Sequence, residues 1–326
     1  MKTVLYLFSI FLLTSSCSSE FASPSSNEID VIKTLWEYID ENYVYFDYKS
    51  IDWDPVEQKF LTKINAETSK DSLFTLCTEM IDVMEDGHNF LNTGDSIYSY
   101  DYTAGFEVNF SGALIKSKYL KSDFEIAGPF TYGLINDSIG YVYVEKFNRA
   151  ALFNNVMQFF TTQEVDKIII DVRNNSGGLP QTAQTMVGYF IDEPTLIGYI
   201  THKDGKAQNE FSNKLEVIAM PQSIYFDKKV NILINRKSFS ASSYFASMTS
   251  YLPNVKLIGQ ITGGGGGSAA AYELPNGWVV GITSNFFLDS RDNHIENGVA
   301  PSIEIENSVL DISMQVDKML ETAIAN

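Results

Sequence analysis

The sequence of 326 residues predicts an α/β protein in which a layered core follows a small helical N-terminal domain. Between residues 29 and 90, apolar side chains recur at spacings of three and four, the period of helices that pack along one face. From residue 138 onward, strand and helix patterns alternate, as in cores where helices cover a sheet. Apolar runs there, such as 168–170, are continuous, which is typical of strands buried on both faces.

The composition indicates a folded, acidic protein and argues against nucleic acid as a partner. The chain carries 41 acidic and 23 basic side chains, a formal charge of −18, and 44% of its residues are hydrophobic. Nucleic acid attracts the opposite charge, and so do anionic membrane surfaces. The length suggests about two domains, and two cysteines cannot form a framework of disulfide bonds.

Residues 1–17 have the pattern of an export signal. Lys2 is followed by an apolar stretch over 4–13, then by small residues and Cys17. This order resembles the lipobox of bacterial lipoproteins, in which the cysteine is lipidated, although Thr14 stands where leucine is more usual. We therefore expect a lipid anchor at Cys17 and a place in the cell envelope, facing the periplasm or the surface. Simple cleavage and secretion is the alternative, and the Ser-rich residues 18–28 suit a flexible tether.

Three helices are predicted in the N-terminal domain, residues 29–90. The first follows the apolar spacing from residue 29 to 39, and the second opens at Asp54 with Pro55 in its first turn. The third starts at Ser69 or Asp71 and ends near Gly87. Residues 91–135 are expected to form short strands and loops, with alternating runs at 106–110 and 113–115.

The predicted α/β core spans residues 136–326. Its expected helices lie at 149–160, 181–191, 240–250 and 312–324, and its expected strands lie at 139–144, 167–172, 196–201, 230–234, 255–258, 270–274 and 278–282.

The sequence offers three histidines as candidates for a general base near neutral pH. His88 follows a glycine at the predicted end of a helix, where a side chain can be held rigidly at a cleft. His202 lies in a predicted exposed turn, and His294 lies in a polar loop. Any one of them taken alone is more often a solvated or merely satisfied histidine than a base.

Ser240 lies where a buried strand turns sharply into a helix of small residues. A hydroxyl at such an elbow is exposed, and the N–H of Ala241 points to where an oxyanion would form. The alternative is that Ser238 or Ser240 simply caps the helix.

Gly177 and Gly178 follow another buried strand. Two glycines allow the backbone to approach a ligand closely, so their N–H groups can supply a second oxyanion donor. An ordinary tight turn explains them equally well.

Neither a nucleotide site nor a metal site is predicted by the remaining motifs. The glycines at 263–267 lack the lysine and the spacing of a phosphate loop, so nucleotide binding is excluded. No cysteines, histidines and carboxylates have metal-ligand spacing, so we expect no metal and no cofactor. Glu296 lies between a polar loop and a strand, where a carboxylate could orient an imidazole; a solvated glutamate is the alternative.

Taken together, ordered motifs resemble the tail-specific (C-terminal processing) serine protease family, especially its tricorn-like branch. They are IDVRNNSGG at 170–178, SFSASS at 238–243, LIGQITG at 257–263 and GVAP at 298–301, with LWEYIDENY at 35–43 and DGH at 86–88 matching the N-terminal domain. The resemblance implies a core of the ClpP/crotonase-like kind.

The resemblance also implies roles for single residues. It makes Ser240 the nucleophile, His88 the general base and Glu296 the carboxylate that orients it. Backbone N–H groups of Ala241 and of Gly177 or Gly178 would form the oxyanion hole.

The chain departs from the family pattern at several places. Processing-type members use a lysine where this chain has Gly265, which excludes a Ser-Lys dyad and agrees with histidine-based chemistry. The tricorn-like serine before the histidine is Gly87, and the glutamate after the Ser-Ala-Ser element is Ser243. Fewer than about fifty residues separate the helical domain from the core, so we expect a PDZ domain to be absent or vestigial.

The predicted function is a serine-type endopeptidase that cleaves peptides or unfolded proteins in the cell envelope through Ser240, His88 and Glu296. A catalytically weak or inactive lipoprotein that binds a peptide or other ligand is the main alternative, favoured by Gly87 and Ser243. A structural lipoprotein would have no cleft of this geometry.

Overall fold

The fold was analysed in a computed structural model that describes residues 28–65, 68–107 and 109–326. The predicted export signal, the lipidation site at Cys17 and nearly all of the predicted tether lie outside the described residues. Within these ranges, every helix is too short or too polar to cross a membrane.

Four helices form the N-terminal part: α1 (Glu28–Asn42), α2 (Phe46–Lys49), α3 (Asp54–Leu61) and α4 (Lys70–Asp82). The three predicted helices are confirmed as α1, α3 and α4. Pro55 lies in the first turn of α3, and the Ser69 hydroxyl caps α4 by accepting the N–H of Ser72. The short α2 was not predicted, and α4 ends five residues before Gly87, so this glycine is not the helix end that was expected.

The core contains a seven-stranded sheet in the order β13-β10-β9-β6-β5-β4-β3. Its strands are β3 (Glu125–Ala127), β4 (Phe130–Asn136), β5 (Ile139–Val144), β6 (Lys167–Asp171), β9 (Lys229–Ile234), β10 (Val255–Gly259) and β13 (Ile303–Glu304). The central strands β5, β6, β9 and β10 run parallel. Ile168, Ile169 and Ile170 are fully buried, which confirms the prediction of a sheet covered on both faces. The sheet begins before residue 136, because β4 pairs with β5 in register.

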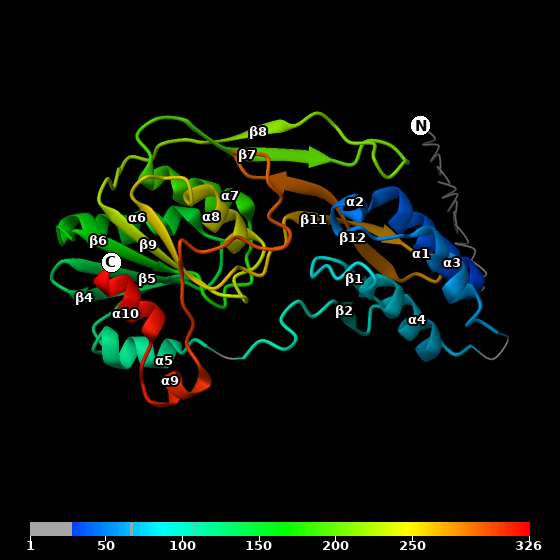
Figure 1. Cartoon of the computed structure of the whole chain (residues 1–326), viewed down its shortest axis with the longest axis horizontal. Coiled ribbons are helices and arrows are strands. Elements are labelled where there is room, and N and C mark those ends of the chain that lie inside the picture. The colour runs from blue at the N-terminus through cyan, green and yellow to red at the C-terminus, as the bar shows by residue number, and fades with distance from the viewer. Residues whose placement is uncertain (1–27, 66–67, 108) are drawn as a thin grey trace, which may run out of the picture.

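Helices cover the two faces of this sheet: α6 (Ala150–Thr162), α7 (Pro180–Val187), η2 (Gly188–Phe190), α8 (Ala241–Thr249) and α10 (Lys318–Ala325). The α/β layered core is thus confirmed. Figure 1 shows this half of the molecule at one end and the helices α1, α3 and α4 at the other.

Two predicted elements were wrong, one in the core and one in the segment 91–135. The helix expected over 312–324 is broken into α9 (Val309–Ser313) and α10. The break occurs because Gln315 adopts φ +59 and the Asp317 carboxylate caps α10 by accepting the N–H of Leu320. The run at 113–115 is helical, in α5 (Gly112–Leu114) followed by the π-helix η1 (Ile115–Tyr119), because Ser111 caps its first turn.

The run expected as a strand at 106–110 contains no strand in its described residues.

Arg173 fixes the C-terminal helix to the sheet. Its fully buried guanidinium pairs with Asp171 at the end of β6 and with Asp317, at 2.6 and 2.9 Å. A buried cation with two hydrogen-bonded carboxylates satisfies charges that would otherwise be costly in this interior.

A second sheet joins the N-terminal helical part to the core. Its order is β2-β1-β12-β7-β8, with β11 also paired to β12. The strands are β1 (Phe90–Asn92), β2 (Ile97–Ser99), β7 (Thr195–His202), β8 (Leu215–Ala219), β11 (Gly267–Glu273) and β12 (Val279–Leu288). Since β1 begins two residues after His88 and pairs with β12, the helical domain and the core share one sheet (Figure 1).

The packing of β1 on β12 can be tested by a substitution at Gly281. In register, Phe90 lies opposite Gly281, and a Cβ on Gly281 would meet the Phe90 ring at 2.0 Å. Gly281→Val should therefore lower the free energy of unfolding by about 1 to 3 kcal/mol through overpacking, measured by urea denaturation.

Ala271→Val is the matched control, because Ala271 is the exposed cross-strand partner of Gly281 on β11. It should cost much less. Equal losses for both variants would contradict the close packing of β1 on β12.

Candidate active site

Ser240 occupies a strained turn between β9 and α8. Its backbone has φ 55 and ψ −121, a conformation that non-glycine residues rarely adopt. Its N–H donates to the carbonyl of Gly264 at 2.9 Å, which holds the turn in place. Such local strain is typical of functional sites, where surrounding structure maintains it. The predicted elbow is therefore present, and Ser240 itself makes no side-chain cap on α8.

His88 lies against Ser240. Its Nε2 is 2.9 Å from the Ser240 Oγ, although the two residues are 152 positions apart. The imidazole packs on the ring of Phe239, with 4.7 Å between centroids. The neighbouring Asn89 is fully buried, and its Oδ1 accepts the N–H of Thr283 in β12 at 2.9 Å. The sheet that contains β1 and β12 thus sets the position of the imidazole.

Gly265 leaves the space that the imidazole occupies. A Cβ at this position would lie 2.9 Å from the His88 Cε1 and 2.5 Å from the Phe239 ring. The residue also has φ +76, which favours glycine. A lysine at position 265 and the observed His88 therefore exclude one another sterically.

Close packing around position 87 also explains why it is a glycine. A Cβ there would lie 2.7 Å from the Tyr102 Cδ1 and 3.0 Å from the Phe239 ring. Tyr102 stacks on Phe239 with 3.8 Å between centroids. A serine at position 87 would have to displace Tyr102, so this aromatic stack takes the room of the side chain that the family resemblance would put there.

Ser243 serves the backbone beside the site. It is fully buried, and its hydroxyl donates to the Thr262 Oγ1 at 2.9 Å. The same Thr262 oxygen accepts the N–H of Val299 at 2.9 Å. Through Thr262, Ser243 therefore connects α8 to the start of the glycine-rich turn (residues 263–267) and to Val299, in the segment after β12.

The glycines after β6 lie beside the serine. A Cβ on Gly177 would lie 2.7 Å from the Ser240 Cβ and 2.9 Å from the N of Ala241. The N–H of Gly177 already donates to the Asn175 Oδ1 at 2.8 Å. Within the described residues, the N–H groups of Gly178 and Ala241 have no acceptor. These two are the free donors among the three residues expected to form an oxyanion hole.

Glu296 is close to the site but has other partners. Its Oε1 pairs with the Lys49 Nζ at 2.8 Å, and its Oε2 accepts the N–H of Gly266 at 2.8 Å. No hydrogen bond joins it to His88 in the described part of the chain, where the His88 Nδ1 is buried without any partner. The expectation that Glu296 orients the imidazole directly is thus not met by this geometry, because Lys49 holds the carboxylate.

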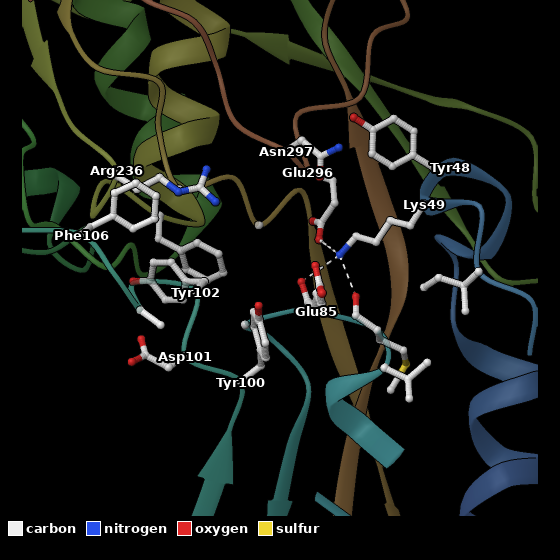
Figure 2. A pocket seen from close by; sticks show the side chains of 18 residues that line it. Tyr48, Lys49, Glu85, Tyr100, Asp101, Tyr102, Phe106, Arg236, Glu296 and Asn297 are labelled. Carbon is white, nitrogen blue, oxygen red and sulfur yellow. Dashed lines mark hydrogen bonds and ion pairs between the residues drawn. The ribbon is translucent and has the colours of Figure 1, made fainter. Parts of the chain in front are cut away.

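Lys49 was missed by the sequence analysis. From the end of α2, its ammonium also donates to the carbonyls of Met84 and Glu85 at 3.0 and 3.1 Å (Figure 2). Its side chain is only 12% exposed. A single lysine at the end of an unpredicted four-residue helix carries no sequence signal that distinguishes it from a surface lysine.

Burial and neighbouring charges shift the ionisation of this cluster. Burial raises the pKa of Glu296 to about 7, and the charge of Asp86 adds to the rise while Lys49 opposes it. Burial lowers the pKa of His88 below its ordinary value; Asp86 opposes this change and Lys49 reinforces it. The imidazole is therefore neutral at neutral pH, which is the form that can accept a proton.

A cavity of about 630 Å³ opens beside Gly87 and Phe239. Figure 2 shows aromatic side chains, Arg236 and acidic groups around it. Those labelled as lining it include Tyr48, Tyr100, Tyr102, Phe106, Asp101 and Asn297. Its lining includes Gly87 and Phe239, the chain neighbours of His88 and Ser240, but neither His88 nor Ser240 itself. A cavity of this size can hold one or more side chains of a peptide.

The other two histidines do not contact Ser240. His202 lies exposed at the end of β7, and His294 packs on Tyr48 and Phe286 at 4.4 and 4.9 Å. Across residues 28–65, 68–107 and 109–326, no group of three or more histidines, cysteines and carboxylates could hold a metal ion.

The chain is similar to known peptidases in both sequence and structure. The sequence model of peptidase family S41 matches residues 138–305, and that of the tricorn protease C1 domain matches residues 32–82. A crystal structure of a candidate peptidase from Parabacteroides merdae is similar, with a TM-score of 0.85 and 31% identity over 92% of this chain and 96% of that one.

Curated relatives match a smaller part. The carboxy-terminal processing proteases CtpB and CtpA of Bacillus subtilis are 24% and 26% identical to this chain, each over 52% of its length. The matches cover 34% and 36% of those proteins, so the chain spans about a third of the length of the curated relatives it matches.

Loss of the Lys49 ammonium should destabilise the protein. Lys49→Met would leave the buried Glu296 carboxylate without its counter-ion, which typically costs about 3 to 5 kcal/mol. The loss should be largest well above pH 7 and smaller at lower pH, where Glu296 is protonated. Chemical denaturation would measure the loss.

Lys63→Met provides the control, since Lys63 pairs with Glu79 at 2.7 Å with both side chains more than 40% exposed. That variant should lose at most about 1 kcal/mol. A Lys49 variant as stable as the Lys63 variant would contradict a buried ion pair beneath the site.

Proposed function

The chain belongs to peptidase family S41, a family of serine peptidases, and on this premise we propose that it is an endopeptidase acting on peptides or unfolded proteins. The observation that carries the proposal is the 2.9 Å contact between the His88 Nε2 and the Ser240 Oγ at the strained elbow. A neutral imidazole at this distance can accept the hydroxyl proton as the serine attacks a carbonyl.

The reaction is an acyl transfer. Ser240 forms a bond to the peptide carbonyl carbon while His88 takes its proton. The free N–H groups of Ala241 and Gly178 receive the charge that develops on the carbonyl oxygen, where one such donor is worth about 2.7 to 4 kcal/mol of barrier. His88 then gives this proton to the leaving amine as the C–N bond breaks. A water molecule next attacks the acyl carbon while His88 takes its proton, and that proton passes to the Ser240 Oγ as the ester bond breaks and the acid leaves.

Glu296 has an indirect part in this scheme. Its carboxylate is 6% exposed and fixed by Lys49 and Gly266. It acts on the site by holding the ammonium of Lys49 and the glycine-rich turn that adjoins Ser240. No step of the reaction requires a cofactor.

A serine-directed fluorophosphonate tests the proposal. It should label the wild-type protein and leave Ser240→Ala unlabelled, and hydrolysis of casein should fall at least about a hundredfold in His88→Ala. His202→Gln is the matched control, because this exposed histidine lies outside the site. A wild-type protein that is neither labelled nor able to cleave casein would refute the peptidase.

A non-catalytic binding protein of the same fold is the second candidate. The observation that favours it is the buried His88 Nδ1, which has no partner to stabilise a protonated ring. In that case the wild type and Ser240→Ala would bind an unfolded peptide with equal affinity, and neither would cleave it.

We further propose that the protein acts in the cell envelope, attached by lipid at Cys17. Support comes from the sequence of residues 1–17, with its charged start, apolar stretch and small residues before the cysteine. When a labelled fatty acid is supplied to expressing bacteria, the wild type should incorporate it and Cys17→Ser should not. Incorporation by both proteins, or by neither, would exclude Cys17 as the lipid-bearing residue.

A further inference from the structure

The proposed function, on which this inference rests, requires one particular tautomer of the His88 imidazole. If the His88 Nε2 accepts the proton of Ser240, the neutral ring must carry its own proton on Nδ1. This Nδ1 is buried, and no hydrogen-bond partner is present among the described residues. A buried N–H without an acceptor costs about 1 to 3 kcal/mol, so the active tautomer needs one.

Few buried acceptors remain free. In the part of the chain that the structure describes, the buried side-chain oxygens without a partner are Asp86 Oδ2, Asp317 Oδ2 and the hydroxyls of Tyr45 and Thr201. Only the two carboxylates can also balance the charge of a protonated ring. Asp317 belongs to the Arg173 cluster, where its other oxygen is 2.9 Å from that guanidinium. Glu296 is engaged through both of its oxygens. Asp86 is therefore the one available carboxylate.

Asp86 is fixed to the backbone of His88, although its Oδ2 is not hydrogen-bonded to the imidazole in this structure. Its Oδ1 accepts the backbone N–H of His88 at 2.9 Å, in the side-chain turn that an aspartate commonly forms with the residue two positions later. The residue is 1% exposed, and its charge acts on the His88 ring. Glycine at position 87 places no side chain between them.

We propose that Asp86 is the positioning residue of this site, which takes the His88 Nδ1–H and stabilises the protonated ring in place of Glu296. The two oxygens of Asp86 then have separate tasks. Oδ1 holds the backbone of His88, and Oδ2 holds the imidazole tautomer that leaves Nε2 free for Ser240. Lys49 pairs with Glu296, so that the buried carboxylates of Glu296 and Asp86 can lie near one another.

The charges that act on His88 are those of Asp86, in the turn after α4, and Lys49, at the end of α2. Glu296, in the segment between β12 and β13, pairs with Lys49. Asp86 raises the pKa of the imidazole and Lys49 lowers it. Loss of the Asp86 charge should therefore lower the pKa of His88.

Nitrogen NMR of the imidazoles in the full chain tests the proposal without relying on activity. The chain has three histidines, so His88→Ala assigns the signal. The neutral ring of the wild type should carry its proton on Nδ1. Asp86→Asn retains an oxygen for the His88 N–H but loses the charge, and it should lower the pKa of His88 by about one unit or more. The share of the Nε2–H tautomer should rise with it.

Glu85→Gln is the matched control, because it removes a neighbouring, exposed carboxylate. It should leave the pKa and tautomer of His88 nearly unchanged, while Asp86→Glu, which retains the charge, should lie closer to wild type than Asp86→Asn. A wild-type ring protonated on Nε2 would overturn the proposal even if no Asp86 variant folds. An Asp86→Asn ring that titrates as in the wild type would overturn it as well.

Kinetics separate this proposal from the proposed function. With an active wild type, Asp86→Asn should reduce kcat/KM by roughly tenfold or more and move the acidic limb of its pH profile to lower pH. Unchanged kcat/KM would refute the role of Asp86 and leave the peptidase intact. If the wild type cleaves nothing while the ring still responds to Asp86, the peptidase fails and the positioning of His88 stands.

Discussion

The pairing of β1 with β12 is the constraint on which the site depends. Ser240 and His88 are 152 positions apart in the sequence, and a proton can pass between them only within hydrogen-bond distance. Three residues of β1, directly after Asn89, pair with Val279, Val280 and Gly281 of β12. Backbone hydrogen bonds fix a strand to within a residue, since a shift by one would turn every side chain to the other face. The buried Asn89–Thr283 bonds then fix the residue next to the imidazole.

A second connection operates through charge. Lys49 reaches from α2 to Glu296 of the core and to the carbonyls of Met84 and Glu85, which precede the histidine. Because these groups are largely buried, each would be costly alone and together they are satisfied. The pKa of Glu296 is nevertheless raised to about 7, because burial and the charge of Asp86 outweigh the effect of Lys49. The ammonium, which lines the cavity, therefore connects α2, the turn after α4 and the segment that contains Glu296. The packing of the helical domain thereby affects the ionisation of Glu296 and His88.

The sequence predicted the layered core and the three longer helices because both depend on periodicity, which is local. It also placed Ser240 at the elbow between β9 and α8, since such an elbow has a local signature. His88, expected at a helix end, lies instead in the turn after α4. The partners of Glu296 could not be predicted, because Lys49 acts through a fold that brings α2 against the core. Asp86 did carry a signal, an aspartate two positions before the histidine, whereas the break at Asp317 depends on the distant Arg173.

Glycines decide which chemistry this backbone can support. At position 265 a side chain would occupy the volume of the imidazole, and at position 87 it would displace Tyr102 from its stack on Phe239. A base that comes from the helical domain and a base that comes from the glycine-rich turn thus compete for the same space beside Ser240. The chain resolves the competition with φ +76 at Gly265, a conformation that few other residues adopt without strain. Replacing the base in such a site would require a new side chain at 265 and also withdrawal of the whole turn that precedes β1.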